Sequence, residues 1–133
     1  MSTAKILIID DDREMRVSLC HLLESAGYEA VAGKSAAEGL EMLSSQTPDA
    51  VLSDVRMPGM DGLEFQRRAR AIARVPVILI SAHGDIAMAV GALQDGAYSF
   101  VEKPFEPRRL LGILKNAVRM LSLIHISEPT RPY

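Results

Sequence analysis

Four aspartates carry the chemistry that this sequence suggests most directly. Asp10, Asp11 and Asp12 are consecutive, and Asp54 follows a separate apolar run. Carboxylates held close together raise one another's pKa, and a divalent cation relieves that repulsion. Oxygen ligands with no His or Cys beside them suit a hard ion such as Mg²⁺. The aspartates therefore indicate a Mg²⁺ site, although one of the three consecutive residues is also expected to cap a helix.

Two further polar residues fit the transfer of a phosphoryl group. A carboxylate can act as a nucleophile and carry a phosphoryl group, and this transfer mainly requires positioning and charge neutralisation. Lys103 could pair with one phosphoryl oxygen, and the hydroxyl of Ser81 could donate to another. Taken singly, Lys103 could be a solvated surface charge, Ser81 a strand-end cap and Asp54 a turn residue. Their joint placement is what favours the functional interpretation.

The pattern of apolar residues predicts the elements that place these groups. Short apolar runs predict strands at 6–9, 29–33, 49–53, 75–80 and 98–101, and helical periodicity predicts helices at 13–26, 35–47, 62–73, 85–94 and 107–121. Strands that alternate with helices imply a flavodoxin-like (βα)5 doubly wound α/β fold, a five-stranded parallel sheet with helices on both faces. Ligands bind at the carboxyl ends of the strands in such a fold, so the polar groups are expected to converge there.

Composition bounds the class of protein. The chain has 133 residues, 48% of them apolar, which fits one globular domain. Its net charge of −2 gives it no general attraction for nucleic acid or an anionic membrane. Its apolar stretches are far shorter than the roughly 20 residues of a membrane span. A single cysteine, Cys20, excludes a disulfide within the chain, so we expect a cytoplasmic protein.

Several motifs of the chain, taken together, resemble the response-regulator receiver domain of two-component signalling. They are Asp10-Asp11, Asp54 followed by Val-Arg-Met-Pro-Gly-Met-Asp-Gly, Ser81-Ala82, and Lys103-Pro104-Phe105. The resemblance covers residues 4 to about 121. Within the family, residues 82–90 and 95–98 most resemble the receivers of sigma-54-dependent activators, in particular regulators of C4-dicarboxylate transport. The resemblance implies a domain that is phosphorylated by a histidine kinase and switches a transcriptional regulator, and that is not a turnover enzyme.

The resemblance also implies a role for each residue at the predicted edge of the sheet. Asp54 would accept the phosphoryl group, and Asp11 and Asp54 would contact Mg²⁺ directly. The carbonyl of Arg56 would be a further ligand, and Asp10 would act directly or through water. Lys103 would bridge to the phosphoryl group.

A conformational switch is implied in the same way. Ser81 would turn towards the phosphoryl group, and Phe100 occupies the position of the family's switch aromatic without the hydroxyl of the Tyr found in many members. The peptide bond before Pro104 is usually cis in the family. Arg56 and His83 occupy variable positions that are expected to influence self-dephosphorylation.

Two segments suggest partners or boundaries. Residues 86–94 form a predicted helix without a charged side chain, and such a helix is usually covered on its outer side. The hypothesis is a homodimer face formed by this helix, residues 98–101 and the fifth helix, although Ala-rich packing would also explain the composition. The receiver is expected to end at residue 121, with 122–133 a vector-derived or disordered tail. An effector part with ATPase (AAA+) and DNA-binding domains would lie outside this chain.

Two other functions use similar residues. A haloacid-dehalogenase-like phosphatase would use Asp10 as its nucleophile and Asp12 as the second aspartate of an Asp-x-Asp motif, with Ser81 and a lysine. Against it, Glu14 stands where that class usually has Thr or Val, and the chain has no room for a cap domain. A flavin-binding module is disfavoured by the acidic loop after the first strand, the absence of Trp and the low aromatic content of 5%.

Overall fold

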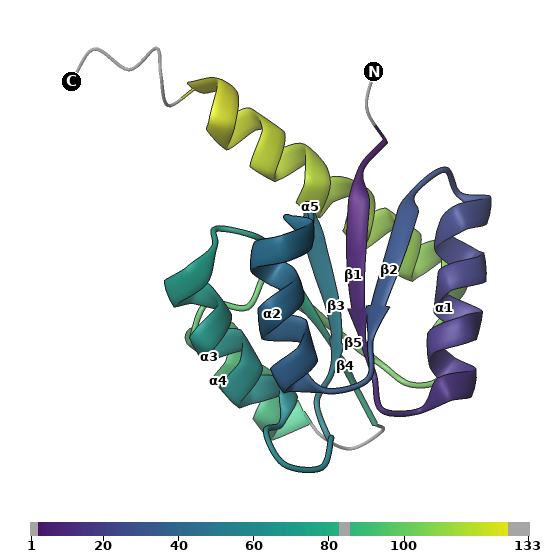
Figure 1. Cartoon of the computed structure of the whole chain (residues 1–133), viewed down its shortest axis with the longest axis vertical. Helices are drawn as coiled ribbons and strands as arrows, with labels where there is room; N and C mark the ends of the chain where they lie inside the picture. Colours follow the sequence, from purple (N-terminus) through teal and green to yellow (C-terminus); the bar gives the residue numbers. More distant parts are fainter. Residues whose placement is uncertain (1–2, 83–85, 128–133) are drawn as a thin grey trace.

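The computed structural model describes residues 3–82 and 86–127, in which strands and helices alternate along the chain (Figure 1). The strands are β1 (Lys5–Ile9), β2 (Glu29–Gly33), β3 (Ala50–Asp54), β4 (Val77–Ser81) and β5 (Ser99–Glu102). The helices are α1 (Arg13–Ser25), α2 (Ala36–Gln46), α3 (Gly62–Ile72), α4 (Ile86–Gln94) and α5 (Pro107–Ser127). The predicted (βα)5 order is confirmed.

The five strands form one parallel sheet in the order β2-β1-β3-β4-β5. This order places β1 and β3 side by side near the middle of the sheet. Their register pairs Ile9 with Ser53, so the residues that follow, Asp10 and Asp54, come at neighbouring positions of the same edge. The doubly wound α/β fold is therefore present, and its strand order brings two of the predicted aspartates together.

Helices cover both faces of the sheet, and each face has its own hydrophobic cluster. Under α2, α3 and α4, side chains such as Leu43 and Phe65 pack on Leu7 and Leu79. Under α1 and α5, side chains such as Leu23, Leu110 and Leu114 pack on Ile8 and Ile80. Because both faces are covered, β1, β3 and β4 consist almost entirely of buried residues, as their largely apolar sequences predict.

Side-chain caps fix where the helices begin. The Asp12 side chain accepts a hydrogen bond from the Glu14 N–H at the start of α1, and Ser35 caps α2 through the Glu38 N–H. The cap at Asp12 agrees with the prediction that one of the three consecutive aspartates caps a helix. Since β1 ends at Ile9 and α1 is capped at Asp12, the connection between them consists of the three consecutive aspartates.

The main departure from the predicted elements lies at the end of the chain. Helix α5 continues to Ser127, and its last turns extend beyond the sheet (Figure 1). The prediction that helical structure ends at about residue 121 is therefore wrong. Residues 122–127, which the prediction assigns to the tail, are part of α5.

Helix α4 carries apolar side chains on its outer side, as its uncharged sequence indicates. Val90 is 45% exposed and Leu93 is 38% exposed, whereas Ala89 and Ala92 are buried against the sheet. Within the described residues, no helix is long and apolar enough to cross a membrane.

Candidate functional site

The carboxyl ends of four strands carry the predicted site residues. Asp54 and Ser81 are the last residues of β3 and β4, and Asp10 and Lys103 directly follow β1 and β5. One carboxylate oxygen from each of Asp10, Asp11 and Asp54 lies within 4.8 Å of the other two. The structure therefore brings the predicted acidic cluster together from two strand ends.

Asp54 is a member of this cluster and also lies close to Lys103. Its side chain is largely buried, and Oδ1 accepts a hydrogen bond from the Val55 N–H at 2.9 Å. The same oxygen is 3.6 Å from Nζ of Lys103. Asp54 and Lys103, which follow different strands in the sequence, are therefore neighbours at this edge of the sheet.

Asp10 is held differently. It is 1% exposed, and its Oδ1 accepts a hydrogen bond from the Asp12 N–H at 2.9 Å. Its other carboxylate oxygen, Oδ2, is buried and accepts no hydrogen bond from the described residues. An unpaired buried carboxylate oxygen is costly unless a cation or a proton satisfies it. Asp11, by contrast, is exposed to solvent.

Burial makes both inner carboxyl groups weaker acids. Burial raises the pKa of Asp10, and the negative charge of Asp54 raises it further, while the Asp12 N–H and Lys103 act in the opposite direction. Burial also raises the pKa of Asp54, against the lowering effects of Lys103 and the Val55 N–H. The ionised carboxylates are therefore destabilised in this site, and a bound cation would offset part of this destabilisation.

The two predicted switch residues lie at different depths. Ser81 is buried at the end of β4, and its carbonyl accepts a hydrogen bond from the Lys103 N–H at 2.8 Å. Phe100 lies two positions before the end of β5, is half-buried and packs against the hydrophobic cluster under α2, α3 and α4. The peptide bond between Lys103 and Pro104 is cis, as expected.

The loop after β3 places Arg56 at the rim of the site. Arg56 is exposed, and its Nη2 donates to Sδ of Met88 in α4 at 3.5 Å. A pocket of about 390 Å³ separates this loop from α4, with Met57, Pro58 and Asp61 in its lining. His83, the second residue expected to affect self-dephosphorylation, lies outside the described residues.

Gly62, the last residue of the motif that follows Asp54, has a structural role that the sequence alone did not indicate. Its backbone N–H donates to the Val55 carbonyl at 2.8 Å, and a Cβ added at this position would lie 2.2 Å from the carbonyl oxygen of Asp54. Only a residue without a side chain allows α3 to begin this close to β3. The Asp61-Gly62 sequence at a helix start was the available signal, because Asp61 is the cap of α3.

Comparison with known proteins assigns the family. Residues 6–115 match the model of the response regulator receiver domain. The chain belongs to this family. A receiver domain from Clostridium thermocellum has the same fold, with a TM-score of 0.88 and 31% sequence identity over 91% of this chain and 98% of that one. The resemblance stated from the motifs is confirmed, and the phosphatase alternative is not favoured.

Relatives of this receiver include transcriptional regulators. The C4-dicarboxylate transport transcriptional regulatory protein DctD of Rhizobium meliloti is 44% identical over 126 residues, which are 93% of this chain and 27% of that protein. The transcriptional regulatory protein FixJ of Bradyrhizobium diazoefficiens is 43% identical over 86% of this chain and 56% of its own length. The chain thus spans about a quarter to half of these relatives.

Proposed function

We propose that this receiver accepts a phosphoryl group on Asp54 from a histidine kinase and that the modification switches the output of a transcriptional regulator. The observation that carries the proposal is the position of the Asp54 carboxylate. It is buried at a strand end, with a carboxylate oxygen of Asp10 and of Asp11 within 4.8 Å and Nζ of Lys103 3.6 Å from its Oδ1. The protein holds this carboxylate in a fixed position, and Lys103 would neutralise negative charge on a phosphoryl group bound to it.

The reaction transfers a phosphoryl group between two residues. A carboxylate oxygen of Asp54 forms a bond to phosphorus as the bond from phosphorus to the kinase histidine nitrogen breaks, and the nitrogen leaves with the electron pair. Lys103 pairs with an oxygen of the transferred group and balances its charge. Later attack of water on phosphorus releases inorganic phosphate and restores the carboxylate. We expect Arg56 and His83 to alter the rate of this last step.

The donor set fits Mg²⁺. The buried Oδ2 of Asp10 lacks a partner among the described residues, and the three carboxylates offer only oxygen. Asp10, Asp11 and Asp54 would hold the ion together with the carbonyl of Arg56, and the remaining positions would go to water and phosphate. When bound, Mg²⁺ supplies positive charge to the phosphoryl oxygens.

Phosphorylation of Asp54 would change the conformation of residues in β4 and β5. Ser81 would turn its hydroxyl towards the phosphoryl group, and Phe100 would change its packing at the edge strand β5. The hydrogen bond from the Lys103 N–H to the Ser81 carbonyl connects the ends of these neighbouring strands directly. The exposed apolar side of α4, with β5 and α5, would then form a homodimer face that phosphorylation rearranges.

The partners follow from this scheme. They are a sensor histidine kinase, which would phosphorylate this receiver in the cytoplasm, and the effector part of a longer regulator, with AAA+ ATPase and DNA-binding domains. Nucleic acid would be bound by that part and not by the receiver, which would end at residue 121. Control of C4-dicarboxylate transport is the pathway that the similarity to DctD favours.

Acetyl phosphate tests the acceptor. With Mg²⁺ present, intact mass spectrometry should show one phosphoryl adduct on the wild-type chain and none on Asp54→Asn. The exposed Asp95→Asn is the matched control and should be phosphorylated as the wild type is. An Asp54→Asn variant that still forms the adduct or hydrolyses phosphate esters would overturn the proposal.

Sedimentation tests the homodimer. The wild-type chain should shift towards a dimer when beryllofluoride replaces the phosphoryl group, and Leu93→Glu in the exposed side of α4 should prevent the shift. Ile72→Glu, an equally apolar exposed position on α3, should leave it unchanged. A wild-type chain that stays monomeric at high concentration in both states would contradict the dimer.

A further inference from the structure

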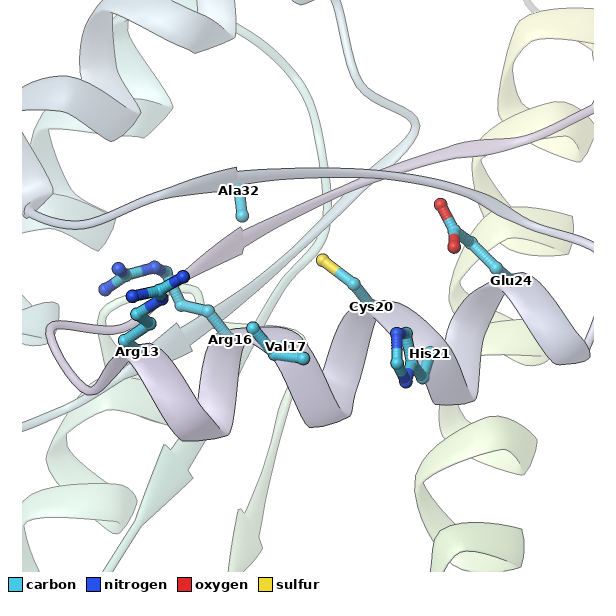
Figure 2. A pocket seen from close by; sticks show the side chains of 7 residues that line it. All are labelled: Arg13, Arg16, Val17, Cys20, His21, Glu24 and Ala32. Carbon is cyan, nitrogen blue, oxygen red and sulfur yellow. The ribbon is translucent and has the colours of Figure 1, made fainter.

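Arg16 of α1 is tied to the backbone of the acidic cluster although it belongs to none of the groups assigned to the site. Its Nη1 donates a hydrogen bond to the backbone carbonyl of Asp10 at 2.7 Å, and its own backbone N–H donates to the carbonyl of Asp12 at 3.0 Å. The residue therefore contacts both ends of the Asp10–Asp12 segment. Figure 2 shows the Arg16 side chain at the first turns of α1, next to Arg13.

The Asp10 carbonyl needs such a donor. The pairing of β1 with β2 ends at Ile9 and Gly33, followed by a hydrogen bond from the Asp10 N–H to the Gly33 carbonyl. The Asp10 carbonyl thus lies just past the paired part of β1, in a residue that is 1% exposed. A buried carbonyl that accepts no hydrogen bond destabilises the folded state. Arg16 provides the donor from the next element of the chain.

Holding this carbonyl also fixes Asp11. The peptide unit between Asp10 and Asp11 is planar, so the direction of the carbonyl sets the positions of both flanking Cα atoms. The Asp10 side chain is already fixed by the Asp12 N–H. Asp11 is exposed and has no comparable burial to orient it, yet its carboxylate lies within 4.8 Å of the other two.

We infer that Arg16 is a positioning residue for divalent-cation binding, which acts by fixing the Asp10–Asp11 peptide unit so that both carboxylates face Asp54. The inference rests on the proposed Mg²⁺ site and deepens it. Groups that orient metal ligands from outside the ligand set typically change metal affinity by about 10–100-fold when they are removed.

The sign of the effect separates positioning from simple electrostatics. Arg16 is positively charged and lies close to the acidic cluster, so loss of its charge alone would strengthen cation binding. Loss of positioning would weaken it. Arg13 is the matched control, because it lies one turn earlier on the same helix, carries the same charge and is exposed.

The experiment is a Mg²⁺ titration of the unphosphorylated chain. Calorimetry and the amide NMR signals of residues 10–12 monitor the binding. Arg16→Gln should raise the dissociation constant about tenfold, whereas Arg13→Gln should leave it unchanged or lower it. Arg16→Lys, which keeps the charge and a donor, should recover part of the affinity. Unfolding in Mg²⁺-free buffer reports any general loss of stability separately.

Arg16→Gln binding Mg²⁺ as tightly as Arg13→Gln would overturn the inference, whether or not the variant is less stable. Should Arg16→Gln fail to fold, the comparison of Arg16→Lys with wild type decides, and equal affinities would count against Arg16. Phosphorylation of the wild-type chain by acetyl phosphate is measured in parallel. Its failure would refute the proposed function, while its success with unaltered Mg²⁺ affinity in the variants would refute only the role of Arg16.

Discussion

The ends of β1 and β3 each deliver a buried aspartate to the same edge of the sheet, but they hold it in different ways. Asp54 of β3 has the cation Lys103 at 3.6 Å and the Val55 N–H on the same oxygen. Asp10, after β1, keeps Oδ2 without a partner among the described residues. We therefore expect different roles for the two residues, with the β3 carboxylate accepting the phosphoryl group and the β1 carboxylate binding a cation.

Removal of Lys103 should give the largest effect, because it acts on the reacting carboxylate. We expect Lys103→Gln to slow phosphorylation by acetyl phosphate by about a hundredfold, the typical cost of losing one group that stabilises charge in a transition state. Lys115→Gln, an exposed position on α5, is the charge-matched control and should react normally. Rates measured by intact mass at saturating Mg²⁺ test this, and equal rates for the two variants would remove Lys103 from the mechanism.

A substitution at Gly62, where α3 begins close to β3, tests whether the position of the β3 end is fixed. Gly62→Ala places a Cβ against the Asp54 carbonyl, and overpacking of this kind costs about 1–3 kcal/mol of unfolding free energy. Gly112→Ala in α5 meets no atom within 4 Å and should stabilise the protein by about 0.5–1 kcal/mol. Urea unfolding measures both changes. A neutral Gly62→Ala would show that the β3 end tolerates displacement.

Removal of the N-cap of α1 or of α2 separates an effect on the β1–α1 connection from a general loss of stability. Asp12→Ala and Ser35→Ala each remove one N-cap and should each cost about 1 kcal/mol of stability. Only Asp12→Ala lies in the connection that holds Asp10, so only it should also change Mg²⁺ affinity. Calorimetry on both variants checks this, and equal Mg²⁺ affinities would mean that the β1–α1 connection tolerates loss of its cap.

The raised pKa of Asp10 sets the sign of the pH dependence. The folded state binds this proton more strongly than the unfolded chain does, so the contribution to stability is present at low pH and is lost as pH rises from the usual value of 3.8 through the raised pKa. Asp10→Asn cannot titrate, so its stability relative to wild type should increase over that window. Unfolding in Mg²⁺-free buffer tests this, and a difference that is flat or falls with pH would contradict it.

Sequence patterns were sufficient to predict the elements and the convergence of the candidate site residues at one edge of the sheet. Largely apolar runs ending in Asp10 and Asp54 predict buried parallel strands, and in such a sheet their carboxyl ends share one edge, which the structure confirms. The end of α5 at Ser127 was missed because the prediction places residues 122–133 in a tail outside the fold.

The contacts that hold the reacting groups were not accessible to the same reasoning. Gly62 and Arg16 act through backbone carbonyls of other elements, Asp54 and Asp10 respectively. A carbonyl carries no sequence signal, so the need for a small residue or a donor near it becomes visible only when the chain is folded.

The central claim is that Asp54, and none of the neighbouring aspartates, accepts the phosphoryl group. Borohydride reduces an aspartyl phosphate to homoserine with release of phosphate, so peptide mass spectrometry after phosphorylation with acetyl phosphate and reduction identifies the acceptor. The account predicts homoserine at position 54 alone. Homoserine at position 10, 11 or 12, with Asp54 intact, would contradict it.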